Sequence, residues 1–245
     1  MLRFSFFGEA ELGVKVIIPA AGSGKRMGED KPKQYISLAG LPLLVHTIST
    51  FEKSALVDEI VLVVRKDEVA WVKENILEGN SLRKVKKVVE GGKERQDSVA
   101  SAIKWLWDTT GENDIVMVHD GARPFLPQNK IHECIHEAQK SGACVLGLKV
   151  TETLKMVDGE GMISSTLSSG DIWVAQTPQA FKWPLLKEAY LRAREDRFYG
   201  TDEASLVERL PHPIRIIPGV FWNIKITFPE DFQLAEQIIK MGIVS

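Results

Sequence analysis

The chain has 245 residues, of which 44% are hydrophobic, enough for one large domain with a sizeable core. Its 31 basic and 33 acidic side chains leave a net charge of −2, so there is no general attraction to nucleic acid or acidic membranes. No apolar run approaches the ~18 residues of a membrane span. Cys134 and Cys144 are too few for a disulfide framework and fit a reducing cytoplasm. We therefore expect a cytoplasmic protein with no nucleic-acid or membrane partner.

The first residues, 1–13, are interpreted as an N-terminal extension. They contain Phe4, Phe6 and Phe7, but their apolar core is too short for a signal peptide. Residues 14–245 are expected to form a single domain.

From residue 14 onwards, apolar strand patterns alternate with helical ones. The expected strands lie at 14–21, 59–64, 85–89, 114–119 and 143–148. Between them, helical faces are carried by 42–51, 69–76, 99–106 and 128–140. This alternation predicts an α/β, Rossmann-like, doubly wound fold with a mostly parallel sheet. Ligands in such folds gather at the carboxyl ends of the strands.

The alternation breaks within 151–167. Two short extended runs, 151–157 and 162–167, surround Asp-Gly-Glu-Gly, which predicts a β-hairpin inserted in the domain. From the residues alone, this hairpin is as compatible with a surface decoration as with a functional arm. The remaining expected elements are an extended segment at 173–176, helices at 184–194 and 202–210, strands at 214–217 and 224–228, and a helix at 229–241.

The first strand leads into a cationic, glycine-containing loop, and 16–33 reads V-I-I-P-A-A-G-S-G-K-R-M-G-E-D-K-P-K. Small residues let the backbone approach a ligand closely, and the cations can neutralise a phosphate. The loop is not a Walker A motif, which would need glycine at Pro19, nor a dinucleotide fingerprint, which would need glycine at Met27. The alternative to a phosphate site is a tight turn with solvated lysines.

Five motifs in this order resemble the 2-C-methyl-D-erythritol 4-phosphate cytidylyltransferase family. They are P-A-A-G-S-G-K-R-M-G with K-P-K-Q-Y, E-G-G-K-E-R, V-H-D-G-A-R-P, Q-T-P-Q and N-I-K-I-T, spread over about residues 14–240. The resemblance implies an enzyme of isoprenoid precursor synthesis. Its partners would be CTP and a sugar-alcohol phosphate, and pyrophosphate would be released.

Such a transfer brings two anions together, so it needs positive charge and alignment more than acid–base groups. Arg26 offers a planar fork for phosphate oxygens, and Lys33 a point charge for the α-phosphate. Lys225, between apolar residues, is costly to bury unless an anion meets it. We expect these three residues to be catalytic, and the resemblance assigns Arg26 and Lys33 the same role.

The remaining site residues rest on the loop pattern and on the resemblance. Expected nucleotide contacts are Ala20, Ala21, Gly22, Gly24, Gly92 and Ser98. Expected substrate contacts are Asp120, Arg123, Thr153, Thr177, Thr201 and Lys225.

Asp120 follows an apolar strand, where a lone carboxylate facing a triphosphate suits one-sided Mg²⁺ ligation. We therefore expect Mg²⁺ as cofactor with Asp120 as its ligand, although other divalent cations would also fit. The alternative is a helix cap or a structural pair with Arg123.

In the family resembled, the hairpin at 151–167 is an arm that crosses to a second subunit, so the resemblance implies a homodimer. Members usually carry a phosphate-binding arginine four residues before the tryptophan that precedes Thr-Pro-Gln. Here that position is Ser169, and Lys155 is a candidate replacement cation.

Three other functions match parts of the sequence. The related ribitol 5-phosphate cytidylyltransferases generally show Leu-Ala-Gly-Gly at 19–22 and a bulkier residue at Ala122. His132 and His136 match the zinc-protease pattern H-E-x-x-H, but the apolar positions of that helix leave both on its flank. A nucleotide sensor without turnover is the third alternative.

Overall fold

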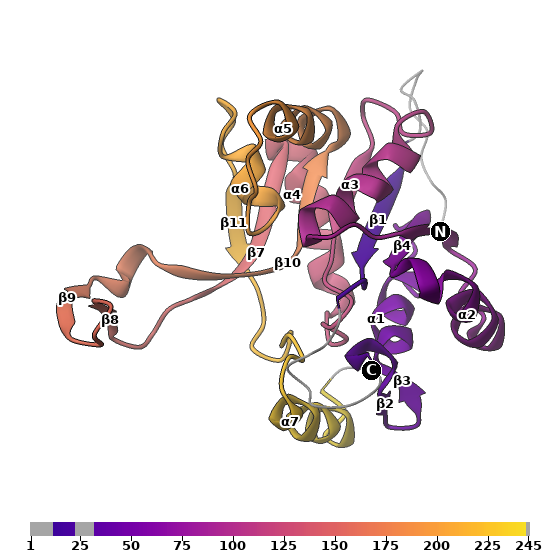
Figure 1. The fold of residues 1–245 in the computed structure, drawn as a ribbon, viewed down its shortest axis with the longest axis horizontal. Helices are drawn as coiled ribbons and strands as arrows, with labels where there is room; N and C mark the ends of the chain where they lie inside the picture. The colour runs from indigo at the N-terminus through magenta and orange to yellow at the C-terminus, as the bar shows by residue number, and fades with distance from the viewer. Residues whose placement is uncertain (1–11, 23–31, 244–245) are drawn as a thin grey trace.

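Seven strands form one central sheet in the order β11-β7-β10-β6-β1-β4-β5, with helices on both faces (Figure 1). This computed structural model describes residues 12–22 and 32–243. The strands are β1 Val14–Pro19, β4 Glu59–Val64, β5 Val85–Glu90, β6 Ile115–Val118, β7 Ala143–Lys149, β10 Trp173–Lys182 and β11 Arg215–Pro218. Two small sheets pair β2 Ser37–Leu38 with β3 Leu41–Pro42 and β8 Leu154–Val157 with β9 Ile163–Leu167.

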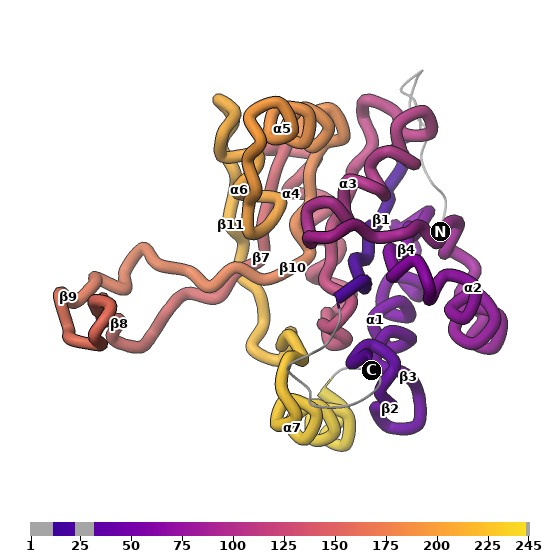
Figure 2. The backbone as a smooth tube through the Cα atoms, viewed as in Figure 1, coloured from indigo at the N-terminus to yellow at the C-terminus, as the bar shows by residue number. Residues whose placement is uncertain are grey.

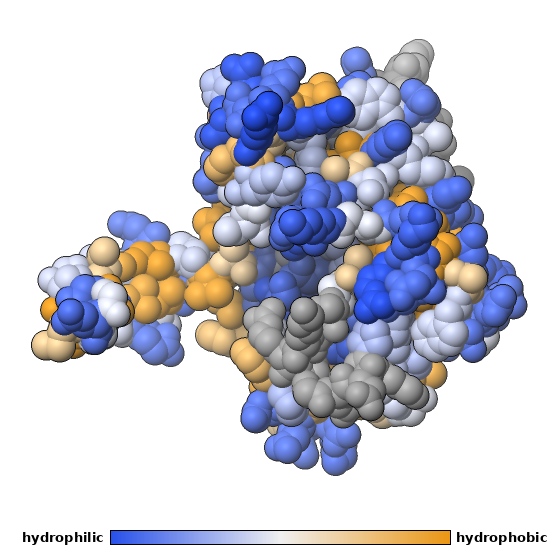
Figure 3. Space-filling model, in the orientation of Figure 1, coloured by the Kyte–Doolittle hydropathy of each residue, from blue (hydrophilic) through white to orange (hydrophobic). Residues whose placement is uncertain are grey.

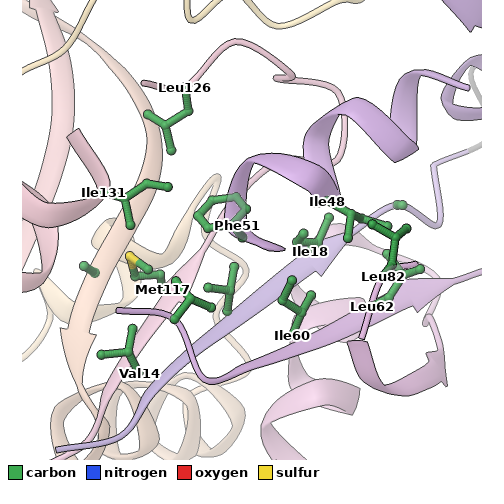
Figure 4. Close-up of a cluster of buried hydrophobic side chains, with 14 of the residues drawn as sticks. Val14, Ile18, Ile48, Phe51, Ile60, Leu62, Leu82, Met117, Leu126 and Ile131 are labelled. Carbon is green, nitrogen blue, oxygen red and sulfur yellow. The ribbon is translucent and has the colours of Figure 1, made fainter. Parts of the chain in front are cut away.

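The central strand β1 is buried on both faces because its branched side chains alternate between two cores. Ile18 belongs to the cluster that also contains Ile48 and Phe51 of α1, as Figure 4 shows. Ile17 points the other way, into a cluster with Val99 and other residues of α3. The strand pairs in parallel with β4 and β6, and this places its carboxyl end beside theirs.

Helices cover both faces of the sheet, as expected for a doubly wound fold. They are α1 Leu43–Glu52, α2 Val69–Val72, α3 Arg95–Leu106, α4 Gln128–Ser141, α5 Trp183–Glu195, α6 Glu203–Val207 and α7 Pro229–Lys240. Helices α1 and α4 bury residues in one core, and α3, α5 and α6 in the other. Across 12–22 and 32–243, no helix combines the length and apolar character that a membrane crossing requires. The predicted α/β fold is confirmed.

The strand expected at 173–176 extends further than its sequence indicates. β10 continues to Lys182 and runs antiparallel to both of its neighbours, β6 and β7. Its pairing with β7 shifts register between Ala175 and Gln179, around Pro178, where the apolar pattern is interrupted. The sheet is therefore mostly parallel, with one antiparallel strand inside it.

The prediction of a strand at 224–228 is wrong, because the backbone N–H groups of this segment donate to groups outside any strand ladder. Ile226 donates to the carbonyl of Ala122 at 2.9 Å. Thr227 and Phe228 donate to the carboxylate of Asp231, at 2.7 and 2.9 Å, and so cap the start of α7. The segment is a loop that is fixed to the residues following β6.

Two predicted helices are shorter than expected. The helix at 69–76 is α-helical only over α2 and continues as a π-turn at Lys73–Leu77 and a 3-10 turn at Glu78–Asn80. The helix at 202–210 spans only α6, which Asp202 caps by accepting from the backbone N–H of Ser205 at 3.0 Å.

The predicted hairpin is present as β8 and β9, and it projects away from the body of the molecule (Figures 1 and 2). Hydrophobic side chains gather on it in Figure 3. Met156, Val157, Met162 and Ile163 are between 50% and 65% exposed. The described part of the chain therefore leaves the apolar face of this arm uncovered.

Candidate active site

A cavity of about 350 Å³ opens at the carboxyl ends of β1, β5 and β6. Its walls come from 19–22 after β1, from 92–95 at the start of α3, and from 120–122 after β6. Lys33, Gln34, Ser98, Lys225 and Thr227 complete the lining. This edge is where open α/β sheets bind their ligands.

The wall after β1 is held in place by bonds to two other segments. The Ala20 N–H donates to the carbonyl of Val63 at 2.7 Å, and the buried Gln34 amide donates to the carbonyl of Ala20 at 2.9 Å. A Cβ on Gly91 would come within 2.5 Å of the Ala21 Cβ, so only glycine lets the two loops approach this closely. Ala20 and Ala21 are therefore fixed in place, and together with Gly22 they form the floor of the cavity.

The loop before α3 is shaped by Ser98. Its hydroxyl accepts from the Gly92 N–H at 3.1 Å and donates to the carbonyl of Glu94 at 3.1 Å. Gly92 also needs to be glycine, because a Cβ there would lie 2.3 Å from the Cβ of Asp97. The structure thus brings Gly92 and Ser98 to the same cavity as Ala20, Ala21 and Gly22.

Asp120 is a buried carboxylate surrounded by three cations. Lys225 Nζ lies 3.0 Å from one carboxylate oxygen, Arg123 Nε lies 3.3 Å from the same oxygen, and Arg95 Nε lies 3.4 Å from the other. Burial by itself would raise the pKa of Asp120, but the charges of Lys225, Arg95 and Arg123 outweigh it and hold that pKa below its ordinary value. Asp120 is therefore ionised.

Lys33 reaches the same cavity from the segment that precedes β2. Its ammonium donates to the carbonyl of Ile226 at 2.7 Å, one residue beyond Lys225. The structure therefore brings Lys33, Lys225 and Asp120 together although they are far apart in the sequence.

Two residues of the charge cluster around Asp120, namely Arg95 and Glu203, were missed by the sequence reasoning. Arg95 makes a bidentate ion pair with the buried Glu203, at 2.8 and 2.9 Å, and Tyr190 donates to Glu203 at 3.1 Å. Burial would lower the pKa of Arg95, but Glu203 and Asp120 raise it overall. Arg95 stands within the E-G-G-K-E-R motif, so a signal for it existed, whereas no pattern marked Glu203.

The other predicted site residues either lie outside the described residues or do not line the cavity. Gly24 and Arg26 lie outside the described residues. Four expected substrate contacts, Arg123, Thr153, Thr177 and Thr201, are not among the described residues that line the cavity. Thr153 and Thr201 are exposed, and Thr177 is buried behind Asp120.

No group of three or more His, Cys, Asp or Glu side chains within 12–22 and 32–243 is arranged to hold a metal ion. His132 and His136 are exposed on α4, as the apolar pattern of that helix indicated. Lys155, the candidate replacement for the expected arginine, donates to the Thr166 hydroxyl across the hairpin at 2.7 Å.

His119 lies between β6 and Asp120 and is completely buried. Its Nε2 is 2.9 Å from the carbonyl of Arg123, and its Nδ1 is 3.1 Å from the Thr177 hydroxyl. Burial lowers the pKa of His119 to about 4, although the charge of Asp120 opposes this shift.

Comparison with known proteins gives a consistent result. Residues 14–241 match the family model described as IspD, 2-C-methyl-D-erythritol 4-phosphate cytidylyltransferase. A relative with that name from Syntrophus aciditrophicus is 44% identical over 227 residues, which cover 93% of this chain and 96% of the relative.

Two solved structures show the same fold. One is 4-diphosphocytidyl-2C-methyl-D-erythritol synthase from Anaerococcus prevotii, with a TM-score of 0.79, 29% identity, and coverage of 94% of this chain and 96% of that one. The other is 2-C-methyl-D-erythritol 4-phosphate cytidylyltransferase from Thermus thermophilus, with a TM-score of 0.76, 31% identity, and coverage of 94% and 100%.

The buried histidine makes stability depend on pH in a defined window. The unfolded chain binds the His119 proton with a pKa of about 6.5, and the folded chain with a pKa of about 4. Stability is therefore full above pH 6.5 and is lost as the pH falls towards 4, by at most about 3 kcal/mol. Urea unfolding between pH 7 and 4.5 measures this loss, and a His119→Gln variant should be less stable but lack this part of the slope. Equal slopes for the two proteins would contradict the assignment.

Proposed function

This chain belongs to the 2-C-methyl-D-erythritol 4-phosphate cytidylyltransferase family, and we propose that it transfers a cytidylyl group from CTP to 2-C-methyl-D-erythritol 4-phosphate. An oxygen of the substrate phosphate attacks the α-phosphorus of CTP. The bond from that phosphorus to the β-phosphate oxygen breaks, and pyrophosphate leaves. The observation that carries the proposal is the convergence of Lys33, Lys225 and Asp120 on the cavity beside the Ala20–Gly22 floor.

The electrostatics of the cavity favour two anionic reactants. Among the described residues that line the cavity, two are carboxylates, Glu94 and Asp120. Four are cations, namely Lys33, Lys93, Arg95 and Lys225. The surplus of positive charge attracts phosphates and stabilises the charge that develops during their transfer.

Three of the cations, Lys33, Arg26 and Lys225, have a proposed task. Lys33 stabilises the α-phosphate as it is attacked, and Arg26, carried over from the family resemblance, binds phosphate oxygens beside it. Lys225 binds the phosphate of the substrate, because its side chain lines the cavity and is 42% exposed while Asp120 fixes its position from behind.

The nucleotide is proposed to bind over the floor formed by Ala20, Ala21 and Gly22. Gly24, carried over from the family resemblance, is proposed as a further nucleotide contact. The base would lie against Gly92 and Ser98, where the Ser98 hydroxyl already fixes the shape of the loop. Backbone groups at this position read the edge of the base, and the glycines leave room for it.

A magnesium ion fits this site only as a companion of the triphosphate. Asp120 is the buried carboxylate of the cavity, and both of its oxygens already receive hydrogen bonds or charges from cations. A carboxylate has about four lone-pair positions, and three cations already face those of Asp120. Asp120 would therefore supply a single oxygen to the metal, and the phosphates would supply others. When bound, the ion would neutralise charge on the triphosphate and on the departing pyrophosphate.

The substrate half of the site is proposed to be completed in a homodimer. Thr153 precedes β8 on the arm and does not line the cavity of its own chain, so it would reach the cavity of the partner. Thr201 is proposed to contact the substrate from the loop before α6. Since CTP is a cytoplasmic metabolite, we also propose a cytoplasmic location.

The packing at Ala122 favours methylerythritol phosphate over ribitol phosphate. Ala122 is buried against Ile226, whose N–H donates to the Ala122 carbonyl at 2.9 Å. A bulkier residue, as in the ribitol enzymes, would push away the loop that carries Lys225. The small side chain of Ala122 therefore allows the position that the Lys225 loop takes in this structure.

The substrate proposal is tested by measuring pyrophosphate release with CTP and Mg²⁺. Methylerythritol 4-phosphate should react, and ribitol 5-phosphate should be a poor substrate by kcat/KM. The reverse preference would reject the substrate, and the absence of release with either would reject the activity. Replacing both His132 and His136 with alanine serves as a control that should leave the rate unchanged.

The role of Lys33 is tested by Lys33→Ala. Loss of one electrostatic contact made in the transition state should lower kcat by roughly 10²–10³, with a much smaller change in the affinity for CTP. Lys86→Ala is the matched control, because its ammonium also donates to a backbone carbonyl, that of Arg83 at 3.1 Å, but it does not line the cavity. Equal turnover of the two variants would remove Lys33 from catalysis.

The arm is tested by placing a charge on its apolar face. Ile163→Glu should convert a dimer into a monomer in sedimentation experiments, because Ile163 is 64% exposed on the single chain and is proposed to be covered by the partner. Ser164→Glu, on the opposite side of the same strand, should disturb the dimer less. A wild-type protein that is monomeric at micromolar concentration would refute the proposal.

A further inference from the structure

The backbone N–H of Asp120 donates to a side chain, the hydroxyl of Thr177, at 3.0 Å. The reason lies in the interruption of β10. Its pairing with β6 begins at Gln179, opposite Val118, and its pairing with β7 shifts register between Ala175 and Gln179. A threonine hydroxyl therefore takes the place of a ladder carbonyl at the position where the ion-paired carboxylate leaves the sheet.

The direction of the hydrogen bonds at His119 follows from chemistry. The carbonyl of Arg123 can only accept, so Nε2 of His119 carries the proton. The Thr177 hydroxyl already accepts from Asp120, and its own hydrogen needs an acceptor, which Nδ1 of His119 provides at 3.1 Å. The neutral Nε2–H tautomer thus satisfies every group, in a ring that is fully buried and packed edge-on against Phe51.

Thr177 also holds the other partner of the ion pair. Its backbone carbonyl accepts from the Asn223 amide at 2.8 Å, and the carbonyl of Asn223 accepts from Arg123 at 2.8 Å. Lys225 follows two residues later, with its ammonium 3.0 Å from Asp120. One residue therefore anchors Asp120 through its hydroxyl and the Lys225 loop through its carbonyl.

We propose that His119 is a positioning residue that acts through Thr177. By accepting the hydroxyl hydrogen of Thr177, it aims the oxygen lone pair at the N–H of Asp120 and so sets where Asp120 meets Lys225. This assignment rests on the proposed function for its kinetic consequence. It also gives Thr177 a task other than the substrate-phosphate contact that the family resemblance implies, because the single hydrogen of its hydroxyl is directed to His119.

The proposal is tested by a double-mutant cycle in the full-length protein, with CTP, Mg²⁺ and methylerythritol 4-phosphate. Thr177→Val removes the hydroxyl at nearly constant shape, and His119→Gln removes the acceptor at Nδ1. Each should lower kcat about 10-fold, the size expected for one buried hydrogen bond, with KM for CTP little changed. The double variant should also lose about 10-fold in kcat, because both changes break the same chain of hydrogen bonds from Asp120 through Thr177 to His119. Thr177→Ser, which restores the hydroxyl, should stay within about 3-fold of the wild type.

A purely structural role predicts other results. Losses that multiply to about 100-fold in the double variant would overturn the proposal, as would a Thr177→Ser variant as slow as Thr177→Val. If His119→Gln does not fold, the comparison of serine with valine at 177 still decides.

A second measurement does not depend on turnover. Nitrogen NMR of the wild-type protein labelled in its histidines should show His119 as the neutral Nε2–H tautomer. An Nδ1–H tautomer or an imidazolium would overturn the proposal, because Nδ1 could then not accept the hydrogen of Thr177. Failure of the proposed function would appear differently, as a wild-type protein that shows this tautomer but does not release pyrophosphate.

Discussion

The contact between Lys225 and Asp120, 3.0 Å apart, is the interaction on which the site depends. A buried carboxylate is unfavourable unless it is paired and hydrogen-bonded. Asp120 meets this requirement with cations from three places: Arg95 at the start of α3, Arg123 beyond β6, and Lys225 on the loop after β11. The need to pair one charge therefore draws together segments that the sheet alone would leave apart. The cations outnumber the carboxylates, and the excess is available to phosphates.

The sheet was largely predictable because its strands are runs of branched apolar residues, as in β1 and β4. Prediction failed where local pattern and tertiary pairing disagree. Pro178 lacks an N–H and looked like the end of a strand, yet β10 resumes its ladder at Gln179. Ile224 and Ile226 alternate as in a strand, but their segment gives its N–H groups to Ala122 and to the helix-capping Asp231. Neither outcome is encoded within the segment itself.

The same distinction applies to the site. Lys33, Gly92 and Asp120 could be located from motifs, since each stands beside a strand end or a glycine turn, and the structure places all three on one cavity. The partnership of Arg95 with Glu203 could not, because the two residues are 108 positions apart and nothing local marks the buried glutamate. The hydroxyl of Thr177 was visible in the sequence, but its partner is His119, which follows the neighbouring strand β6. Sequence patterns identify chemical groups, whereas their pairing is decided by the topology of the sheet.

Ser169 adds to the importance of the hydrogen bonds that anchor the Lys225 loop. Where the family resembled usually offers an arginine to the substrate phosphate, this chain has an uncharged side chain, and Lys155 on the arm donates to Thr166. The proposed contact of Lys225 with the substrate phosphate would then meet more of the phosphate charge, through a single flexible side chain with a point charge. Its usefulness depends on how well its loop is fixed, and that loop is tied to Thr177 through Asn223 and to Ala122 through Ile226. Under the proposed function, an uncharged Ser169 makes the hydrogen bonds that fix the Lys225 loop more important.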